Sequence, residues 1–317
     1  MKKVMLTGAS GFVGRSLLER LHQEGYELVA PSRTPLAGAP VGVCNPLVGE
    51  LAADVDWGGS LENVSVVIHS AARVHVMNDT ADDPLVEFRK ANFDGTVSLA
   101  RQAAAVGVRR FVFISSIKVN GEGTEPGQPY RADDTPAPQD PYGVSKMEAE
   151  QALRAVASET GMEVVIIRPV LVYGPGVKAN FRSMMSWLSK GVPLPLGATG
   201  NKRSLVAVDN LVDLIATCIE HPAAANQTFL VSDGEDLSTT QLLQRMGSAL
   251  GRPARLLPVP ASLLQASAAM LGRRAIAQRL CGSLQVDITK TRELLGWTPP
   301  VSVDDALRRT AHAFAAG

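Results

Sequence analysis

Short apolar runs alternate with amphipathic stretches along the first half of the chain. The runs predict strands at Val4–Leu6, Glu27–Ala30, Val66–His69, Phe111–Ile114 and Val164–Ile167, with a further strand at Thr228–Val231. Between these runs, apolar positions recur at helical spacing and predict helices at Phe12–Gln23, Pro84–Val106 and Tyr142–Glu159. Continuous apolar strands separated by helices indicate a parallel sheet covered on both faces. The pattern therefore predicts an α/β doubly wound (Rossmann) fold.

The character of the chain changes around Arg168-Pro169. Glycine and proline then cluster at Gly174-Pro-Gly176, Gly191–Pro195 and Gly197–Gly200, which predicts loops at these positions. Helical patterns dominate the rest of the chain. We predict a dinucleotide-binding domain over residues 1–170, to which residues 203–233 return. A smaller, mainly helical region that binds the substrate is predicted over residues 171–202 and 234–317.

The most apolar later stretch, Leu256–Gly272, carries no charged residue. It is shorter than the ~20 residues that span a bilayer and contains Pro258 and Pro260, which argue against a membrane helix. We expect a helix packed on the core or at a subunit interface, with a peripheral membrane contact as the alternative. The N-terminal segment begins like a signal peptide, but its apolar run ends after three residues, so it is better interpreted as a first strand.

Charge and cysteine content narrow the class of protein. Lys plus Arg equals Asp plus Glu at 31 each, so no overall basic field suggests a nucleic-acid or membrane ligand. Cys44, Cys218 and Cys281 are widely spaced and form no CxxC pair, which argues against both a disulfide framework and a zinc site. We expect a cytoplasmic enzyme that uses no metal.

A glycine-rich segment follows the first predicted strand directly, and it reads Thr7-Gly8-Ala-Ser10-Gly11-Phe12-Val13-Gly14. A dinucleotide loop needs a tight turn at Gly8, close approach to pyrophosphate at Gly11 and close helix packing at Gly14. The next helix then points its first N–H groups at the phosphates. The spacing is GxxGxxG rather than GxGxxG, and alone it would also suit an ordinary loop. Its place between a strand and a helix predicts a nicotinamide dinucleotide site.

The end of the second predicted strand bears on which dinucleotide is bound. A carboxylate there would accept hydrogen bonds from the adenosine ribose and repel a 2′-phosphate. The chain instead has Ser32 and Arg33, which can donate to and pair with a 2′-phosphate. We therefore expect NADP(H) to be preferred, with NAD(H) as the alternative.

Three side chains form a candidate proton-transfer site. Ser116 ends a predicted strand, and Tyr142 and Lys146 lie four residues apart on one predicted helix, where they face the same way. Beside a nicotinamide, such a group suits hydride chemistry on a carbonyl. A tyrosine and a lysine at this spacing are also common on exposed helices, so the glycine loop upstream is needed for this interpretation.

Motifs along nearly the whole chain resemble one family. They are Gly8–Gly14, His69-Ser-Ala-Ala72, Asn92-Phe-Asp-Gly-Thr96, Ser115-Ser116, Tyr142-Gly-Val-Ser-Lys146, Arg168-Pro169, Tyr173-Gly-Pro175, Arg203–Val206 with Val208-Asp209, and Leu295-Gly-Trp297. In these residues the chain resembles the extended short-chain dehydrogenases/reductases, within the NAD-dependent epimerase/dehydratase group that acts on nucleotide sugars.

The resemblance implies a role for each matching residue. Tyr142 would transfer the proton, Lys146 would stabilise its phenolate and hold the nicotinamide ribose, and Ser116 would align the reacting oxygen. The cofactor would contact these three positions and Gly8, Ser10, Gly11, Phe12, Val13, Gly14, Ser32, Arg33, Glu50, Leu51, Ala71, Ala72, Asn92 and Pro169. The sugar nucleotide would contact Ser116, Tyr142, Arg73, Lys118, Asn180, Arg203 and Arg279.

Departures from the family patterns guide the choice of reaction. A dehydratase would carry an acidic pair where Ile117-Lys118 stands, so elimination is disfavoured. Asn120 replaces a usual tyrosine and Leu171 replaces a frequent asparagine of the UDP-hexose epimerases. The segments 72–77, 116–121 and 201–204 look most like NADPH-dependent reductases of UDP-2-acetamido-2,6-dideoxy-4-keto-hexoses, which serve O-antigen and lipopolysaccharide synthesis.

We therefore expect 4-ketoreduction of a UDP-sugar. A UDP-glucose or UDP-GlcNAc 4-epimerase that retains NAD is the alternative, and a non-catalytic NADP(H) sensor is a second one. The resemblance also implies a homodimer packed through a four-helix bundle, formed by the Pro84–Val106 helix and the helix that carries Tyr142.

Overall fold

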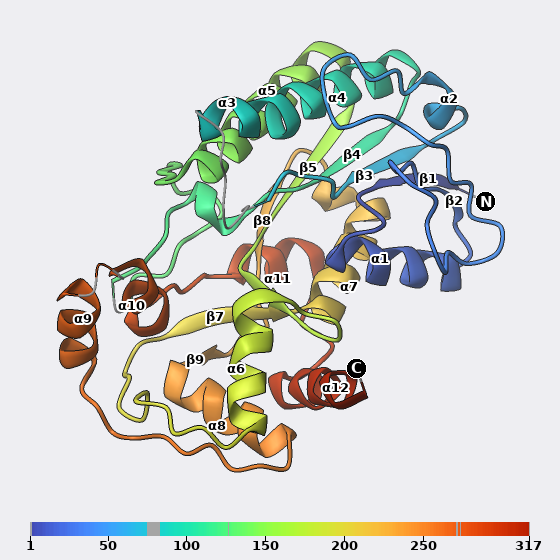
Figure 1. Ribbon diagram of the computed structural model, residues 1–317. Coiled ribbons are helices and arrows are strands. Elements are labelled where there is room, and N and C mark those ends of the chain that lie inside the picture. The colour runs from blue at the N-terminus through green and yellow to red at the C-terminus, as the bar shows by residue number, and fades with distance from the viewer. Residues whose placement is uncertain (1, 75–82, 126, 271, 273, 317) are drawn as a thin grey trace.

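The computed structural model describes residues 2–74, 83–125, 127–270, 272 and 274–316 (Figure 1). Among these residues, six parallel strands form a large sheet in the order β2-β1-β3-β4-β5-β8, and three strands form a small sheet in the order β6-β7-β9. The large sheet confirms the predicted doubly wound α/β fold. Among the described residues, no helix combines the length and apolar character needed to cross a membrane.

The elements of the first part of the chain follow the predicted alternation closely. They are β1 (Lys3–Thr7), α1 (Phe12–Gln23), β2 (Glu27–Val29), α2 (Gly58–Leu61), β3 (Val66–His69), α3 (Pro84–Arg89), a π-helical turn (Lys90–Asp94), α4 (Gly95–Ala105), β4 (Arg110–Ile114), a 3₁₀ turn (Ile117–Val119), α5 (Pro141–Thr160) and β5 (Glu163–Pro169). The helix predicted over residues 84–106 is therefore interrupted by a π-helical turn.

The remaining elements belong to both sheets. They are β6 (Leu171–Tyr173), α6 (Ala179–Ser189), β7 (Arg203–Ala207), α7 (Val208–Glu220), a 3₁₀ turn (Pro222–Ala224), β8 (Thr228–Val231), β9 (Asp236–Leu237), α8 (Thr239–Ala249), α9 (Ala261–Met270), α10 (Arg274–Cys281), α11 (Thr289–Leu295) and α12 (Val303–Ala316). Residues 203–233 are thus divided, because β7 pairs in the small sheet whereas β8 pairs with β5 in the large one.

Helices cover both faces of the large sheet, which explains its uninterrupted apolar strands. In Figure 1, α3, α4 and α5 lie above the sheet, and α1 and α7 lie below it. Alternate strand residues separate into two cores, so that Met5 and Phe111 pack toward α4 and α5 while Leu6 and Val112 pack toward α1 and α7. The carboxyl ends of β1, β3 and β4 consequently meet at one edge of the sheet, where a doubly wound fold binds its ligand.

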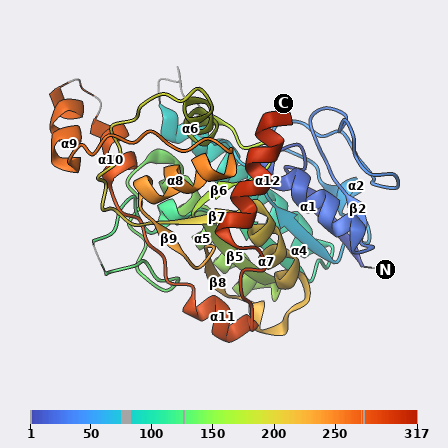
Figure 2. The same cartoon turned by 90° about the horizontal axis from the view of Figure 1, so that it is seen from below.

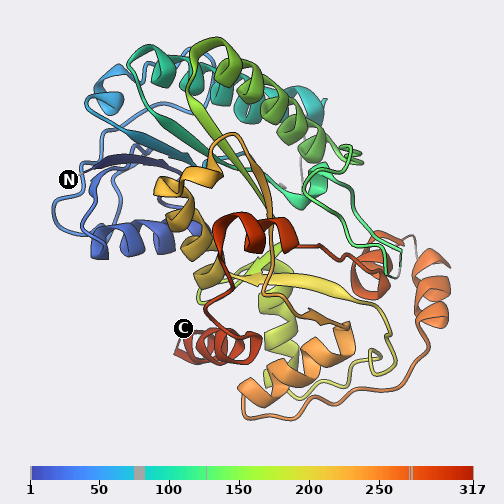
Figure 3. The ribbon, with the colours of Figure 1, turned by 180° about the vertical axis from the view of Figure 1, so that it is seen from behind.

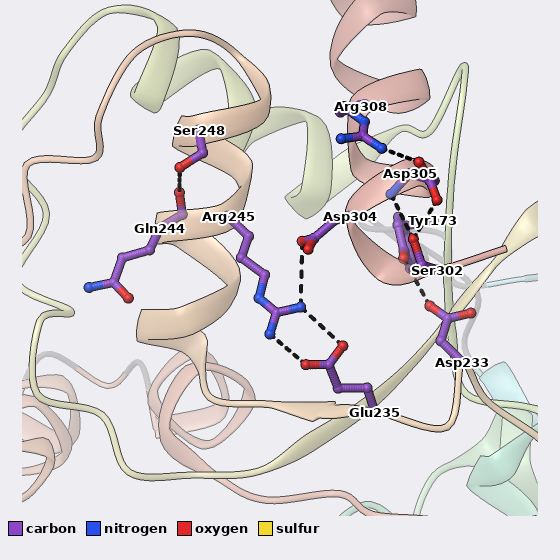
Figure 4. Close-up of polar contacts among 10 residues, drawn as sticks. All are labelled: Tyr173, Asp233, Glu235, Gln244, Arg245, Ser248, Ser302, Asp304, Asp305 and Arg308. Carbon is purple, nitrogen blue, oxygen red and sulfur yellow. Dashed lines mark hydrogen bonds and ion pairs between the residues drawn. The ribbon is translucent and has the colours of Figure 1, made fainter.

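A third core holds the small domain together below the large sheet (Figures 1 and 3). Polar contacts support it (Figure 4): Tyr173 donates to Asp233 Oδ2 at 2.8 Å, and Arg245 of α8 pairs with Glu235 and with Asp304 of α12. Burial, together with the Asp233 charge, raises the pKa of Tyr173, so this phenol is a hydrogen-bond donor at neutral pH.

The apolar segment after α8 differs from its sequence-based expectation. It forms α9 over Ala261–Met270, and none of the residues of this helix is buried. Leu264 packs partly against the third core, but Leu263 and Met270 are exposed. In Figures 1, 2 and 3, α9 lies at the periphery, beyond α10. The predicted helix therefore forms, but it contacts the core only along one edge, and its role at a subunit interface stays a prediction.

Candidate active site

The glycine loop makes a tight turn between β1 and α1. Gly8 has a φ of +75°, and a Cβ at this position would lie 2.7 Å from the backbone nitrogen of Ala71. A Cβ at Gly14 would lie 2.0 Å from the carbonyl oxygen of Gly8, so α1 packs directly on the loop. The first turn of α1 carries no acidic residue, and its N-cap residue, Gly11, has no side chain to cap the first N–H groups. Ser10, Gly11, Phe12 and Val13 thus surround a helix N-terminus that fits a pyrophosphate.

The end of β2 carries a charge pair rather than a free arginine. Arg33 Nη1 lies 3.4 Å from Glu50 Oε1, and both side chains are exposed. Ser32 donates to the Thr34 carbonyl at 2.6 Å and accepts from Asn45 Nδ2 at 2.8 Å. An acid therefore does stand beside this strand end, although it arrives from a loop 17 residues further along the chain.

The same loop packs against the start of α4. A Cβ at Gly95 would lie 2.7 Å from Leu51 Cγ, so only glycine allows Leu51 to approach the helix this closely. Ser98 and Gln102 of α4 donate to the carbonyls of Ala53 and Val55 at 2.7 and 2.8 Å. These contacts fix Leu51 and its neighbour Glu50 on the cofactor side of the large sheet.

Tyr142 lies in the first turn of α5, where the Ser116 hydroxyl is close enough to favour its ionised form. Asp140 caps the helix by accepting from the Gly143 backbone N–H at 2.6 Å. Burial, and after it the Asp140 charge, raise the pKa of Tyr142 to about 12, although the Ser116 hydroxyl opposes the shift. The edge of Tyr142 contacts the Phe88 ring, with 5.9 Å between centroids. The protein alone therefore holds Tyr142 as a neutral phenol.

Lys146 follows one helical turn later and is fully buried. Its Nζ lies 4.1 Å from the centroid of the Phe113 ring, which attracts a cation through its negative face. Burial lowers the pKa of Lys146 to about 7, and the Glu150 charge raises it in opposition. The ammonium is thus held close to its titration point, in contact with an aromatic ring.

His69 ties β1, β3 and α4 together beneath this group. Its Nδ1 lies 2.8 Å from Thr7 Oγ1 and its Nε2 lies 3.0 Å from Thr96 Oγ1. Burial, and then the Lys146 charge, lower the pKa of His69 to about 3. The ring is therefore neutral at physiological pH and acts as a structural hydrogen-bonding group.

The π-helical turn presents Asn92 to two neighbours at once. Asn92 Nδ2 donates to Ser145 Oγ at 3.1 Å and to the Arg73 carbonyl at 3.0 Å, while Oδ1 accepts from the Arg73 backbone N–H at 2.8 Å. The Arg73 guanidinium lies 5.8 Å from the Phe88 ring centroid. Asn92 therefore links the loop after β3, which includes Ala72, to α5, the helix that carries Tyr142 and Lys146.

A buried ion pair anchors the same helix to β5. Arg168 donates from Nε to Glu150 Oε1 at 2.9 Å and from Nη2 to Oε2 at 2.5 Å, and the two side chains are 2% and 3% exposed. Ser115 donates to Glu150 Oε1 at 2.5 Å, and Asn120 Oδ1 accepts from Arg168 Nη1 at 3.0 Å. Pro169 follows as the buried last residue of β5. This network fixes the orientation of α5 and of the residues that follow β4.

Arg203 of β7 lies near enough to Arg279 of α10 for the two charges to interact. Arg203, the first residue of β7, donates to the Gly282 carbonyl at 3.2 Å, and its pKa is lowered by burial and then by the positive charge of Arg279. Two guanidiniums that repel each other form a site that an anionic ligand would stabilise. Asn180 is exposed in the first turn of α6, directly after Ala179, whose φ is +53°.

The structure does not leave every predicted side chain available for a ligand. Lys118 Nζ pairs with Asp140 and with Glu122 (3.0 Å), so its amine is occupied by carboxylates. His75, Val76 and Met77, which contributed to the reductase interpretation, lie outside the described residues. Sequence reasoning also missed the roles of Glu150 and Phe113. The strand period would have placed Phe113 on the face that α5 covers.

The chain belongs to the NAD dependent epimerase/dehydratase family, whose model matches residues 4–232. A UDP-glucose 4-epimerase of Vibrio cholerae is 50% identical over 314 residues, which cover 99% of this chain and 95% of the relative. The fold is also that of a UDP-N-acetylglucosamine 4-epimerase from Bacillus cereus (TM-score 0.81, 19% identity, 99% and 100% coverage). A Thermotoga maritima UDP-glucose 4-epimerase gives a TM-score of 0.77 at 22% identity, with 99% of both chains covered.

These relationships correct the predicted reaction. The 4-ketoreductase prediction is wrong, because a relative with 50% identity along nearly the whole chain is a 4-epimerase. The departure at Asn120, on which that prediction partly rested, has a structural explanation. Asn120 is buried, accepts from Arg168 and donates to the Arg131 carbonyl at 3.0 Å. Because the Asn120 side chain completes the ion-pair network of Arg168, its identity does not distinguish a reductase from an epimerase.

Proposed function

We propose that this protein interconverts UDP-hexoses that differ at C4, with UDP-glucose and UDP-galactose as the first pair to test. The observation that carries the proposal is the intact group of Ser116, Tyr142 and Lys146 in a chain that is 50% identical to a UDP-glucose 4-epimerase over 99% of its length. The reaction is redox-neutral: hydride and proton leave C4 and its oxygen, and both return after the sugar presents its other face.

The glycine cradle fits a nicotinamide dinucleotide, since added side chains at Gly8 and Gly14 would collide with backbone. Bound NAD would supply the hydride acceptor for C4. Tyr142 Oη takes the C4 hydroxyl proton and gives it back on the other face, while Ser116 Oγ holds the C4 oxygen in reach. A group that serves as base and then as acid must have a pKa near the working pH.

The surroundings of Tyr142 and Lys146 determine whether the pKa of Tyr142 can lie near the working pH. Burial raises the pKa of Tyr142 to about 12, too high for a base at neutral pH. We assign the lowering of this value during catalysis to the positive charge of Lys146, one turn away on α5, which would stabilise the phenolate. Glu150 in turn favours the protonated form of Lys146. We therefore assign Lys146 to holding the charge of the phenolate and the nicotinamide ribose, and Glu150 to keeping Lys146 charged.

For the substrate, we assign the diphosphate to Arg203 and Arg279. A guanidinium matches phosphate oxygens with two parallel hydrogen bonds, and the diphosphate charge relieves the repulsion between the two arginines. Asn180, exposed at the start of α6, is the further contact that we propose on this side. The homodimer through α3, α4 and α5 stays a prediction.

For the cofactor, we propose NAD in preference to NADP. The Glu50 carboxylate beside Arg33 neutralises the group that would pair with a 2′-phosphate and itself repels such a phosphate. Glu50→Gln should therefore raise the affinity for NADP relative to NAD, and Arg33→Ala should not weaken NAD binding. Titration of the two cofactors by isothermal calorimetry measures both changes. A wild-type preference for NADP would contradict this assignment.

The function is tested with purified protein and no added cofactor. UDP-glucose should convert to UDP-galactose, which NMR of the products identifies, and denaturation should release bound NAD. The Tyr142→Phe variant is the matched control, because it keeps the glycine loop and lacks the proton-transfer group. Failure to interconvert UDP-glucose with UDP-galactose, or UDP-GlcNAc with UDP-GalNAc, even with NAD added, would refute the proposed function.

A further inference from the structure

The charges of the chain are distributed unevenly. Residues 171–202 contain four Lys or Arg and residues 237–286 contain six, and neither segment contains an Asp or Glu. All 31 acidic residues therefore lie elsewhere, although the formal net charge of the chain is zero. These two segments give the small domain a basic surface that the overall composition conceals.

Several of these basic residues lie away from the proposed substrate contacts. Arg245 is neutralised by Glu235 and Asp304. Lys190, Arg252 and Arg255 are exposed around the far end of α6, where Arg252 donates to the Ser189 carbonyl at 2.8 Å. Ser189, the last residue of α6, lies nine residues after Asn180, which is about 14 Å along the helix at 1.5 Å per residue. The basic residues around this end of α6 therefore lie away from Asn180. The UDP-sugar does not account for their charge.

Exposed apolar side chains accompany these charges. The exposed fraction is 45% for Trp187, 39% for Val192, 52% for Leu257, 60% for Leu263 and 83% for Met270, and we call this set the apolar rim. Its segments adjoin, because the Leu194 N–H donates to the Arg255 carbonyl at 2.9 Å and the Leu257 N–H donates to the Leu194 carbonyl at 2.8 Å. The rim continues into α9, which carries no charge and buries no residue.

We propose that the apolar rim and its basic neighbours bind the surface of an anionic lipid bilayer. In this arrangement α9 contributes only its exposed apolar side chains, with Leu263 and Met270 at the boundary between headgroups and acyl chains, and the charges come from other segments. Lys190, Arg252 and Arg255 meet the anionic headgroups. The ten residues of α9 span about 15 Å, half of the ~30 Å hydrocarbon core, so the helix lies on the bilayer and does not cross it.

The positive charge around the apolar rim favours an anionic bilayer over a second copy of the chain as its binding partner. A two-fold dimer places the same patch of both subunits together, and here it would bring Arg252 and Arg255 of one copy against a face of the same sign. Like charges at such an interface oppose association. An anionic bilayer instead satisfies the apolar and the basic residues at once.

Vesicle flotation with the full chain tests the proposal. The protein should float with vesicles of phosphatidylcholine and phosphatidylglycerol at low salt, and binding should weaken at high salt. It should not float with phosphatidylcholine alone. Leu263→Ser with Met270→Ser, and separately Arg252→Gln with Arg255→Gln, should each weaken binding about tenfold. Val41→Ser is the matched control, because Val41 is 94% exposed and lies outside the rim.

Sugar interconversion by the variants on soluble UDP-glucose should match the wild type, which shows that they fold. Absence of flotation, equal binding to neutral vesicles, or unchanged binding in both double variants would overturn the proposal. A dimer that dissociates in the Leu263/Met270 variant, without vesicle binding by the wild type, would assign the rim to a second copy. Flotation requires no turnover, so this test and the test of the epimerase function fail independently.

Discussion

The two sides of the active site are built differently. On the large-sheet side, Lys146 and His69 are completely buried: His69 forms hydrogen bonds with residues of β1 and α4, and the Lys146 amine lies over the Phe113 ring of β4. On the small-domain side, Asn180 and Arg279 are exposed and Arg203 is only half-buried. The large-sheet side, which we call the frame, therefore surrounds the proposed proton-transfer residue with buried neighbours, whereas the proposed substrate contacts come from short segments with fewer constraints. Chemistry and substrate choice can change separately in such a protein.

The largest expected effect is a loss of turnover when the proposed proton-transfer residue of the frame is replaced. Tyr142→Phe removes the proton-transfer group and keeps the ring that contacts Phe88, so kcat for UDP-glucose interconversion should fall by about 10²–10⁴-fold. NAD affinity and the thermal unfolding midpoint should stay near wild type. Steady-state kinetics and calorimetry measure these quantities. Retained turnover would show that another group handles the proton and that the frame is only structural.

The second largest expected effect is a loss of folding stability when a buried ion pair of the frame is broken. Glu150→Gln leaves the buried Arg168 guanidinium without a counter-charge, which should cost about 3–5 kcal/mol of unfolding free energy in urea denaturation. Glu148→Gln is the control on the same helix. It breaks a pair with Arg89 that is partly exposed to solvent, and pairs of this kind are worth about 0–1 kcal/mol. Equal losses in the two variants would contradict the contrast between buried and exposed anchoring.

On the substrate side, the effect should appear in binding and not in chemistry. Arg203→Ala should raise the KM for UDP-glucose about ten- to hundredfold, because it removes a charge-assisted contact of about 1.5–3 kcal/mol. The kcat, the NAD affinity and the stability should change little. Arg308→Ala, an exposed arginine on α12, is the control. An equal rise in the Kd for NAD would indicate that Arg203 supports the frame instead.

The last effect is absent near neutral pH and appears only in acid, through the buried side chain of His69. Its pKa of about 3 in the folded protein lies below the ordinary 6.5, so the unfolded chain binds the proton first. The neutral form of His69 therefore contributes fully to the free energy of unfolding above pH 6.5. This contribution is lost as the pH falls toward 3, by about 1.4 kcal/mol per pH unit. His69→Gln should flatten the pH dependence of the unfolding free energy, whereas His22→Gln, at an exposed position, should not.

The sequence predicts the frame better than the substrate side for a physical reason. Strands, helices and the placement of Ser116, Tyr142 and Lys146 follow from local periodicity and motif spacing, and the fold confirms the doubly wound sheet. The pairing of Glu50 with Arg33 depends on the path of a loop, which no local pattern encodes. Asn120 shows the same limit, since its role in the Arg168 network is tertiary, and reading it as a marker of reaction type led to the wrong chemistry.

The π-helical turn at Lys90–Asp94 limits how this chain tolerates deletions. Each residue of a regular α-helix rotates the chain by about 100°, and a π-turn holds one residue more than the helix around it. Deleting Lys90 would restore an uninterrupted helix from α3 to α4 and turn Asn92 away from Ser145 or Arg73. A single-codon deletion on the outside of the molecule would thereby disconnect a loop at the cofactor from the catalytic helix, without altering any catalytic residue.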